Sequence, residues 1–297
     1  VAKNTNHNYP APISIVSCVY EGCQVPIDTG LRIETNYFAE LIADPVAGNM
    51  IRTLFINKKS ADKLRARPEG FEKTQVNTLG MLGAGMMGSG ISLVSARSGM
   101  NVILLDSTEE QAAKGKNYTE KFLEKRVKKG KMTPEAAAEV LDRITVTTDF
   151  NDLAECDLII EAVFENREIK ADVTQKTEAV ISEETVFASN TSTLPITGLA
   201  ESSSRPEGFI GMHFFSPVER MPLVEIILGK ETSDRALAAA LDYVQQIRKT
   251  PIVVNDSRGF FTSRVFSTAC NEANTMLTEG VSPALIENAA RHAGYPV

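Results

Sequence analysis

A glycine-rich turn between a predicted strand and a predicted helix is the feature that most restricts the fold of this chain. Residues 76–82 form a short, mostly apolar run, the sequence GAGMMG follows at residues 83–88, and an apolar helical pattern comes next. A second apolar run, NVILLD, then ends in Asp106. Because a strand, a tight turn, a helix and a second strand in this order form a βαβ unit, the two strands are expected to lie parallel in one sheet.

The glycines of this turn, Gly83, Gly85 and Gly88, follow the order GxGxxG. In such a turn the first glycine permits the tight bend, the second lets the backbone approach a pyrophosphate, and the third allows the helix to pack closely on the strand. The free N–H groups at the start of the helix then point toward the phosphates. The position of the turn between a strand and a helix therefore predicts a dinucleotide site of the Rossmann type.

Asp106 lies at the end of the second strand, 18 residues beyond Gly88. A carboxylate at this place is suited to accept hydrogen bonds from the adenosine ribose hydroxyls, and the next two residues provide no arginine for a 2′-phosphate. This pattern favours NAD over NADP. The alternative is that the glycines only pack a helix on a strand and that Asp106 only caps the next helix.

Strands and helices alternate through the rest of the central sequence. Further strands are expected at residues 144–148, 157–163, 185–190, 208–215, 223–228 and 250–256, and further helices at about 109–129, 134–142, 168–181 and 234–248. This alternation predicts a doubly wound α/β fold with a mainly parallel sheet.

The sequence before this central pattern is different. Residues 30–64 carry apolar residues at helical spacing that is interrupted at Asp44 and Pro45, which predicts two helices in tandem. A charged stretch with proline and glycine follows, so a linker is expected at residues 65–75. We therefore predict a first region of linker helices at residues 1–75.

The central pattern gives way to helical patterns after Gly259. We predict a NAD-binding domain at residues 76–254 and the truncated start of an all-α domain at residues 255–297. Because the chain begins at Val1 and stops directly after a helical pattern, both ends are expected to be cuts in a longer protein.

Composition excludes several classes of function. The net charge of −7 argues against the broad positive surface that nucleic acids or anionic membranes require. The sequence has no run of about 18 uncharged apolar residues and no secretory signal pattern, so membrane insertion and export are not expected. The four cysteines, at positions 18, 23, 156 and 270, form no metal-type CxxC pair. Their scatter indicates reduced thiols in a cytoplasmic compartment, and no metal site is proposed.

One of the three histidines, His213, lies in an apolar strand pattern, and Glu225 lies twelve positions later in another. If the two strands form an antiparallel pair with a register centred on Glu219, His213 and Glu225 face each other. A carboxylate beside an imidazole orients the ring and stabilises its protonated form, so the pair could act as a general base on a substrate hydroxyl. The alternative is a hydrogen-bonded core histidine without a catalytic role.

Two further groups of polar residues have open interpretations. Asn190, Thr191, Ser192 and Thr193 end a predicted strand, where ligands bind in open α/β sheets, but such residues are also common helix caps. The helix after the second strand carries a basic run, which is either a solvated helix face or an electrostatic site for a phosphate-rich substrate such as coenzyme A. This basic run consists of Lys121, Lys125, Arg126, Lys128, Lys129 and Lys131.

Six stretches resemble the 3-hydroxyacyl-CoA dehydrogenases, and in particular the dehydrogenase part of multifunctional fatty-acid β-oxidation enzymes of the alpha-subunit type, fused to an enoyl-CoA hydratase. The matching stretches are LGAGMMGSGIS, VILLD, IIEAVFENREIK, FASNTSTLPIT, GMHFFSPVERMPLVEII and DSRGFF, in family order. Together they cover about residues 76–270. The resemblance implies NAD-dependent oxidation of (S)-3-hydroxyacyl-CoA to 3-oxoacyl-CoA.

The resemblance also implies roles for individual residues. His213 would be the catalytic base, Glu225 its orienting partner, and Ser192 the hydroxyl near the nicotinamide and the substrate oxygen. Lys129, Ser192 and Ser263 would contact the acyl-CoA substrate. The implied NAD site consists of Gly83, Gly85, Met87, Gly88, Asp106, Val163, Phe164, Glu165, Lys170, Asn190, Ser192 and Ser216.

Two residues depart from the family pattern. Ser263 stands in GFFTSR where single-function relatives carry asparagine, and its shorter reach weakens a hydrogen bond to the substrate oxygen. Phe122 stands where a serine that contacts coenzyme A is common. Both departures concern substrate contacts, whereas the cofactor positions follow the family pattern.

The resemblance extends to the ends of the chain and to partners. Residues 1–75 are similar to the end of the hydratase part and its linking helices, and hydratase activity is not expected because the paired catalytic glutamates would lie upstream of Val1. A thiolase subunit in a full-length complex and a homodimer are the partners that the resemblance allows. Two alternatives stay open: a dehydrogenase of a 3-hydroxy acid without coenzyme A, and a catalytically silent NAD-binding or structural relative.

Overall fold

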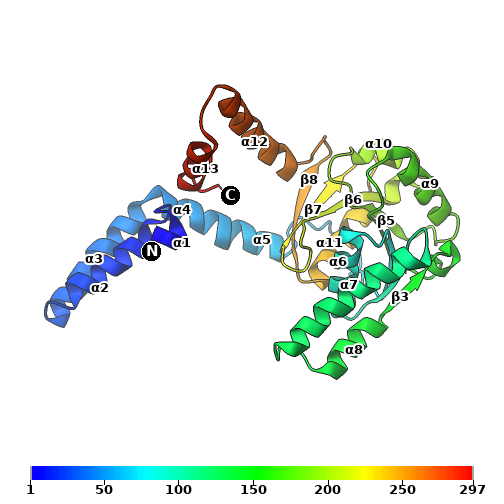
Figure 1. Cartoon of the computed structure of the whole chain (residues 1–297), viewed down its shortest axis with the longest axis horizontal. Coiled ribbons are helices and arrows are strands. Elements are labelled where there is room, and N and C mark those ends of the chain that lie inside the picture. Colours follow the sequence, from blue (N-terminus) through cyan, green and yellow to red (C-terminus); the bar gives the residue numbers. More distant parts are fainter. Residues whose placement is uncertain (1, 296–297) are drawn as a thin grey trace. The chain divides into compact units, whose positions relative to one another are not determined.

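The computed structural model describes residues 2–295, which divide into two compact units. One unit comprises residues 61–264 and contains the sheet (Figure 1). The other comprises the remaining residues at the two ends of the chain and is helical. None of the helices in residues 2–295 is long and apolar enough to cross a membrane.

The sheet has eight strands in the order β3-β2-β1-β4-β5-β6-β7-β8. Neighbouring strands are parallel except for β6 and β7, which are antiparallel. The predicted doubly wound, mainly parallel sheet is therefore confirmed. The strands are β1 Thr78–Leu82, β2 Asn101–Leu105, β3 Ile144–Thr147, β4 Leu158–Glu161, β5 Val186–Ser189, β6 Phe209–Phe214, β7 Leu223–Leu228 and β8 Thr250–Asn255.

Helices cover both faces of this sheet because its strands are apolar on both sides. In β1, Met81 packs in one hydrophobic cluster with Ile91 of α6 and Leu237 of α11, while the next residue, Leu82, packs in a second cluster with Leu199 of α10. The helices of this unit are α6 Met86–Arg97, α7 Glu109–Lys128, α8 Pro134–Asp142, α9 Arg167–Glu178, α10 Ile196–Ala200 and α11 Asp234–Gln246, with 3-10 turns at Phe150–Leu153 and Pro206–Gly208.

Strand order reverses between β1 and β4. The chain runs from β1 outward to β2 and β3, and then returns to the other side of β1 to build β4 to β8. In open α/β sheets, ligands bind at such a switch point, outside the carboxyl ends of the strands. The last residues of β1 and β4, Leu82 and Glu161, are register partners and therefore mark this place.

The predicted linker, residues 65–75, forms neither helix nor strand, but it is held against α11. Arg67 makes an ion pair with the buried Asp242, whose carboxylate also accepts the backbone N–H of Thr74. The side chain of Gln246 bonds to both backbone groups of Val76. These contacts fix the segment that leads into β1.

The helical unit confirms the predicted break at Asp44 and Pro45. Helix α3 (Ile27–Ala43) ends there, and the Asp44 carboxylate accepts the N–H of Val46 at the start of α4 (Pro45–Met50). A π-helix η1 (Ile51–Asn57) and α5 (Lys58–Asp62) continue the chain. The helices α1 (Ala2–Thr5) and α2 (Pro10–Gly22) were not predicted, whereas α12 (Thr262–Thr278) and α13 (Pro283–His292) match the two helical patterns after Gly259.

Candidate functional site

The glycine turn joins β1 to α6 in the way that the sequence predicts. Gly83 has a φ of 93°, and a Cβ on it would lie 2.7 Å from the carbonyl oxygen of Ala162. A Cβ on Gly88 would lie 1.8 Å from the carbonyl oxygen of Gly83, whereas one on Gly85 would meet nothing within 4 Å. Gly83 and Gly88 are therefore required by packing, while Gly85 borders open space where a phosphate could approach.

Asp106 lies beside this turn at the carboxyl end of β2. Its carboxylate accepts the N–H of Ala84 at 2.7 Å and that of Ser107 at 2.6 Å. The next helix, α7, is capped instead by Thr108, whose hydroxyl oxygen accepts the N–H of Gln111 at 3.2 Å. The alternative in which Asp106 serves only as a helix cap is therefore not what the geometry favours.

His213 and Glu225 face each other as register partners on β6 and β7, which confirms the predicted pairing. The distance from Nδ1 of His213 to Oε2 of Glu225 is 2.7 Å, and the two residues are 7% and 0% exposed. Because an ionised carboxylate only accepts, Nδ1 is the donor. The other ring nitrogen, Nε2, is then left as the acceptor in the neutral imidazole.

The Glu225 carboxylate is held by the segment that follows β8 as well as by His213. Its Oε1 accepts the backbone N–H groups of Phe261 and Thr262 at 3.2 and 2.9 Å, and its Oε2 accepts the Thr262 hydroxyl at 2.7 Å. Burial raises the pKa of Glu225, but the hydrogen bonds from His213 and Thr262 outweigh it, so the net pKa is lowered. The sequence interpretation missed Thr262, although it follows directly after the quoted stretch DSRGFF.

The Glu165 carboxylate accepts several hydrogen bonds from the loop after β5. Its Oε1 accepts from the hydroxyl of Thr191 at 2.6 Å, from the N–H of Ser192 at 3.1 Å and from the N–H of Thr193 at 3.1 Å. Burial raises the pKa of Glu165, but the Thr191 hydrogen bond and the charge of Lys170 outweigh it, so the net pKa is lowered. The predicted residues Glu165 and Ser192 are thus brought together, with the exposed Ser192 hydroxyl 3.4 Å from Oε1.

Lys170 is buried beneath this loop, although it lies in the first turn of a helix. Its Nζ is 2.7 Å from Oε1 of Glu161 and 3.4 Å from Oε2 of Glu165. Glu161 is the last residue of β4 and also accepts the N–H of Val163 and the hydroxyl of Ser189. The sequence interpretation gave Glu161 no role, although a lone carboxylate in an apolar strand was the signal that identified Glu225.

The other predicted cofactor residues lie on the surrounding loops. Oδ1 of Asn190 accepts the N–H of Phe214 at 2.9 Å, which ties the end of β5 to β6. The Ser216 hydroxyl lies 3.7 Å from the sulfur of Met86 in the glycine turn. Val163 and Met87 are half-buried, whereas Phe164 is 82% exposed.

The predicted substrate residues are less clearly gathered. Ser263 is half-buried next to Thr262, and Lys129 is exposed at the end of α7. The ring centre of Phe122 in α7 lies 5.7 Å from the guanidinium carbon of Arg97 and 5.9 Å from that of Arg126. Lys129 therefore lies on a helix end, whereas Ser263 lies in the segment that holds Glu225.

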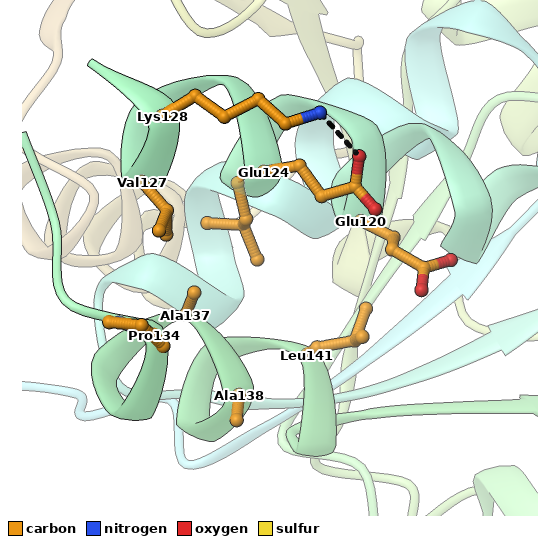
Figure 2. A pocket seen from close by; sticks show the side chains of 9 residues that line it. Glu120, Glu124, Val127, Lys128, Pro134, Ala137, Ala138 and Leu141 are labelled. Atoms are coloured by element: carbon orange, nitrogen blue, oxygen red, sulfur yellow. Dashed lines mark ion pairs between the residues drawn. The ribbon is translucent and has the colours of Figure 1, made fainter. Parts of the chain in front are cut away.

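An apolar groove of about 420 Å³ lies between α7 and α8, with Leu123 and Leu141 among its lining residues (Figure 2). The basic run of α7 contributes Lys128 to its rim, where it forms an ion pair with Glu124 at 3.8 Å. Glu120 also lines the groove. The charge of this helix is therefore mixed at the groove.

Comparison with known proteins identifies two matching family models. The model described as "3-hydroxyacyl-CoA dehydrogenase, NAD binding domain" matches residues 78–257, and "3-hydroxyacyl-CoA dehydrogenase, C-terminal domain" matches residues 259–297. The fatty acid oxidation complex subunit alpha of Shewanella halifaxensis is 37% identical over 298 residues, and that of Psychrobacter arcticus is 37% identical over 296 residues. These matches cover 100% of this chain but 42% and 41% of the relatives.

Two solved structures are similar to the same region. The (S)-3-hydroxybutyryl-CoA dehydrogenase PaaH1 from Ralstonia eutropha superposes with a TM-score of 0.73 at 39% identity, covering 75% of this chain and 79% of that one. FadB2 from M. tuberculosis superposes with a TM-score of 0.71 at 30% identity, covering 75% and 80%. The nucleotide-binding fold inferred from the glycine turn is thus the fold of these relatives.

Proposed function

The chain belongs to the 3-hydroxyacyl-CoA dehydrogenase family, and from this premise we propose that it catalyses the NAD-dependent oxidation of (S)-3-hydroxyacyl-CoA to 3-oxoacyl-CoA. The observation that carries the proposal is the buried pair of His213 and Glu225, 2.7 Å apart. The pair lies on β6 and β7, beyond β4 and β5 in the sheet order and on the side of the switch point away from Asp106. If the adenosine half of NAD lies at Asp106, the nicotinamide half extends toward β6 and β7. The general base is needed beside the nicotinamide, where the substrate alcohol is oxidised.

The residues present fit NAD. Gly85 leaves open space at the start of α6, where backbone N–H groups and the helix dipole favour a pyrophosphate. We assign the adenosine ribose to Asp106, and the nicotinamide half to the loops that carry Glu165, Asn190 and Ser216. Met87, Val163, Phe164 and Lys170 complete the proposed cofactor site. When bound, NAD supplies the acceptor for the hydride that leaves the alcohol carbon.

His213 is proposed to remove the proton of the substrate hydroxyl. With Nδ1 donating to Glu225, the neutral ring presents the lone pair of Nε2 as the base. As the proton arrives, the ring becomes an imidazolium, and the adjacent carboxylate of Glu225 stabilises that charge in a buried setting. Ser192 is proposed to donate a hydrogen bond from its hydroxyl to the substrate oxygen, and Ser263 to donate a second one.

Recognition of coenzyme A is proposed to use Lys129 at the end of α7. An exposed ammonium attracts a phosphate with modest strength, about 1 kcal/mol at contact in water. The alternative substrate, a 3-hydroxy acid without coenzyme A, would gain nothing from this charge. Comparing the turnover of acetoacetyl-CoA with that of free acetoacetate therefore separates the two candidates.

The main test is a His213→Gln variant of this chain. Turnover, followed as NADH oxidation with acetoacetyl-CoA, is expected to fall at least ~100-fold, because the general base is lost. The affinity for NAD, measured by calorimetry, is expected to stay near that of the wild type. Near-normal turnover of the variant would reject the mechanism, and a wild-type chain that binds NAD without turnover would favour the catalytically silent alternative.

Several wider properties are also proposals. We propose the domain division 1–75, 76–254 and 255–297, which is supported by the two family matches at residues 78–257 and 259–297. The relatives are named as alpha subunits of a fatty acid oxidation complex, which supports a partner subunit in the full-length protein. We propose a thiolase as this partner, with a homodimer as the other assembly to test by light scattering. The four free cysteines support a cytoplasmic location.

A further inference from the structure

Glu161 lies at the switch point of the sheet. It is the last residue of β4, its register partners are Leu82 of β1 and Ser189 of β5, and it is 1% exposed. The three residues before it in β4 are buried and apolar. A carboxylate is therefore placed at the end of an otherwise hydrophobic strand, directly below the place where a dinucleotide binds in such sheets.

Three segments of the chain donate to this carboxylate. Oε1 accepts the N–H of Val163 at 2.7 Å and the ammonium of Lys170 at 2.7 Å, and Oε2 accepts the hydroxyl of Ser189 at 2.8 Å. Glu161 thus connects the loop after β4, the first turn of α9 and the end of β5. Lys170 in turn reaches Glu165, which organises residues 191–193.

Fold stability alone gives little reason for this arrangement. Removing a carboxylate and an ammonium from water costs several kcal/mol for each ion, and well-packed apolar residues are often as stable as a buried ion pair. The pair does fix one geometry, because separating the two buried charges would leave each without a partner at a large cost in free energy. A fixed geometry is what a cofactor site requires of the residues beneath it.

Sheet order indicates which half of the cofactor lies above Glu161. Asp106 ends β2 and the glycine turn follows β1, whereas His213 lies on β6. NAD with its adenosine at Asp106 and its reactive ring near His213 must cross the carboxyl ends of β4 and β5. Those are the ends that Glu161 joins to each other.

We propose that Glu161 is a positioning residue for the nicotinamide half of the NAD site, acting through Lys170 and the loop of residues 162–165. It touches neither cofactor nor substrate in this role. The inference rests on the proposed function for the placement of NAD, but it concerns cofactor binding and requires no turnover.

The test compares NAD with ADP, which carries the adenosine and the pyrophosphate but no nicotinamide. A Glu161→Gln variant keeps the shape of the side chain and removes its charge. By calorimetry, its dissociation constant for NAD is expected to rise about tenfold, since hydrogen bonds to a charged group are lost, while that for ADP changes less than about twofold. Equal weakening of both ligands, or of neither, would overturn the proposal.

Asp242→Asn provides the matched control, because Asp242 is also buried, charged and paired with a cation, Arg67, but lies on α11. It is expected to leave the ratio of the two dissociation constants unchanged. The milder Ser189→Ala variant removes one donor and should raise the dissociation constant for NAD about threefold, again without effect on ADP. Ser189→Ala replaces Glu161→Gln as the test variant if Glu161→Gln does not fold. An unchanged NAD affinity in Ser189→Ala then counts against the proposal.

A double-variant cycle tests the route through Lys170. If Glu161 acts by placing this ammonium, adding Glu161→Gln to Lys170→Met should change the NAD affinity less than about twofold. A full additional tenfold loss would refute that route. Failure of these binding tests leaves the His213→Gln result unaffected, so the inference and the proposed function can fail separately.

Discussion

Thr262 donates two hydrogen bonds to Glu225, one from its backbone N–H to Oε1 at 2.9 Å and one from its hydroxyl to Oε2 at 2.7 Å. His213 donates to the same Oε2. The carboxylate is therefore held from one side by the imidazole that it orients and from the other by the first residue of α12. Because both oxygens are fixed, the carboxylate cannot rotate away from the imidazole without breaking these bonds.

Replacement of Thr262 by valine is expected to lower kcat/KM for acetoacetyl-CoA about tenfold, because a hydrogen bond to a charged group is lost while shape and backbone N–H remain. Thr262→Ser, which keeps the hydroxyl, should stay near the wild type. Thr275→Val on the same helix is the matched control, since the Thr275 hydroxyl donates to the backbone oxygen of Asn271 within α12. Equal losses at positions 262 and 275 would show that the hydroxyl has no role in the pair.

The roles of Gly85 and Gly88 in the glycine turn can be separated by alanine substitutions. Gly88→Ala should lower the Tm by about 5 °C or more, because its Cβ would lie 1.8 Å from the oxygen of Gly83. Gly85→Ala has no such neighbour and a φ of −66°, so its Tm should stay near that of the wild type. Its methyl group would nevertheless occupy the approach of the pyrophosphate, so the dissociation constant for NAD should rise about tenfold. Thermal unfolding and calorimetry check both, and a Gly85→Ala protein with unchanged NAD affinity would contradict the assignment of the turn.

Most of the sheet unit could be predicted because the local strand, turn and helix patterns of the sequence match the elements that the fold requires. Every expected strand is present, and α8 has the predicted bounds of residues 134–142. Helix α9 begins at Arg167 because Asn166 accepts the N–H groups of the next turn. Helix α2 was missed because Pro10 and Pro12 suggested an irregular opening, although prolines in a first helical turn remove no intrahelical hydrogen bond.

The site was predictable where strand register decides it and unpredictable where loops do. The pairing of His213 with Glu225 follows from one antiparallel register, which the side-chain alternation of two strands defines. The contacts of Glu165 with Thr191 and Ser192 depend on how two separate loops bend at the ends of β4 and β5. No spacing in the sequence encodes that approach.

Glu165 should contribute to stability in a manner that depends on pH. Burial raises its pKa, but the Thr191 hydrogen bond and the charge of Lys170 lower it further, so the folded value lies below the ordinary value of 4.5. A lowered folded pKa stabilises the protein above the unfolded value, and this contribution is lost as the pH falls through the folded value. The difference in unfolding free energy between wild type and Glu165→Gln, measured with urea, should therefore be constant near neutrality and shrink below pH 4.5. A difference that grows on acidification would contradict the lowered pKa.

Lys129 provides the test of coenzyme A recognition. Its exposed ammonium at the end of α7 is expected to attract a phosphate of the substrate, so Lys129→Ala should raise the KM for acetoacetyl-CoA about threefold to fivefold at low salt. The KM for NADH and kcat should not change, because the chemistry and the cofactor site are untouched.

Lys128→Ala is the matched control, since it removes the same charge one residue earlier, where the ammonium already pairs with Glu124. Increasing the salt concentration should reduce the difference between wild type and Lys129→Ala, because exposed charges are screened. Equal effects of the two lysine variants would indicate only a general attraction by a basic helix, and no effect of either would favour a substrate without coenzyme A.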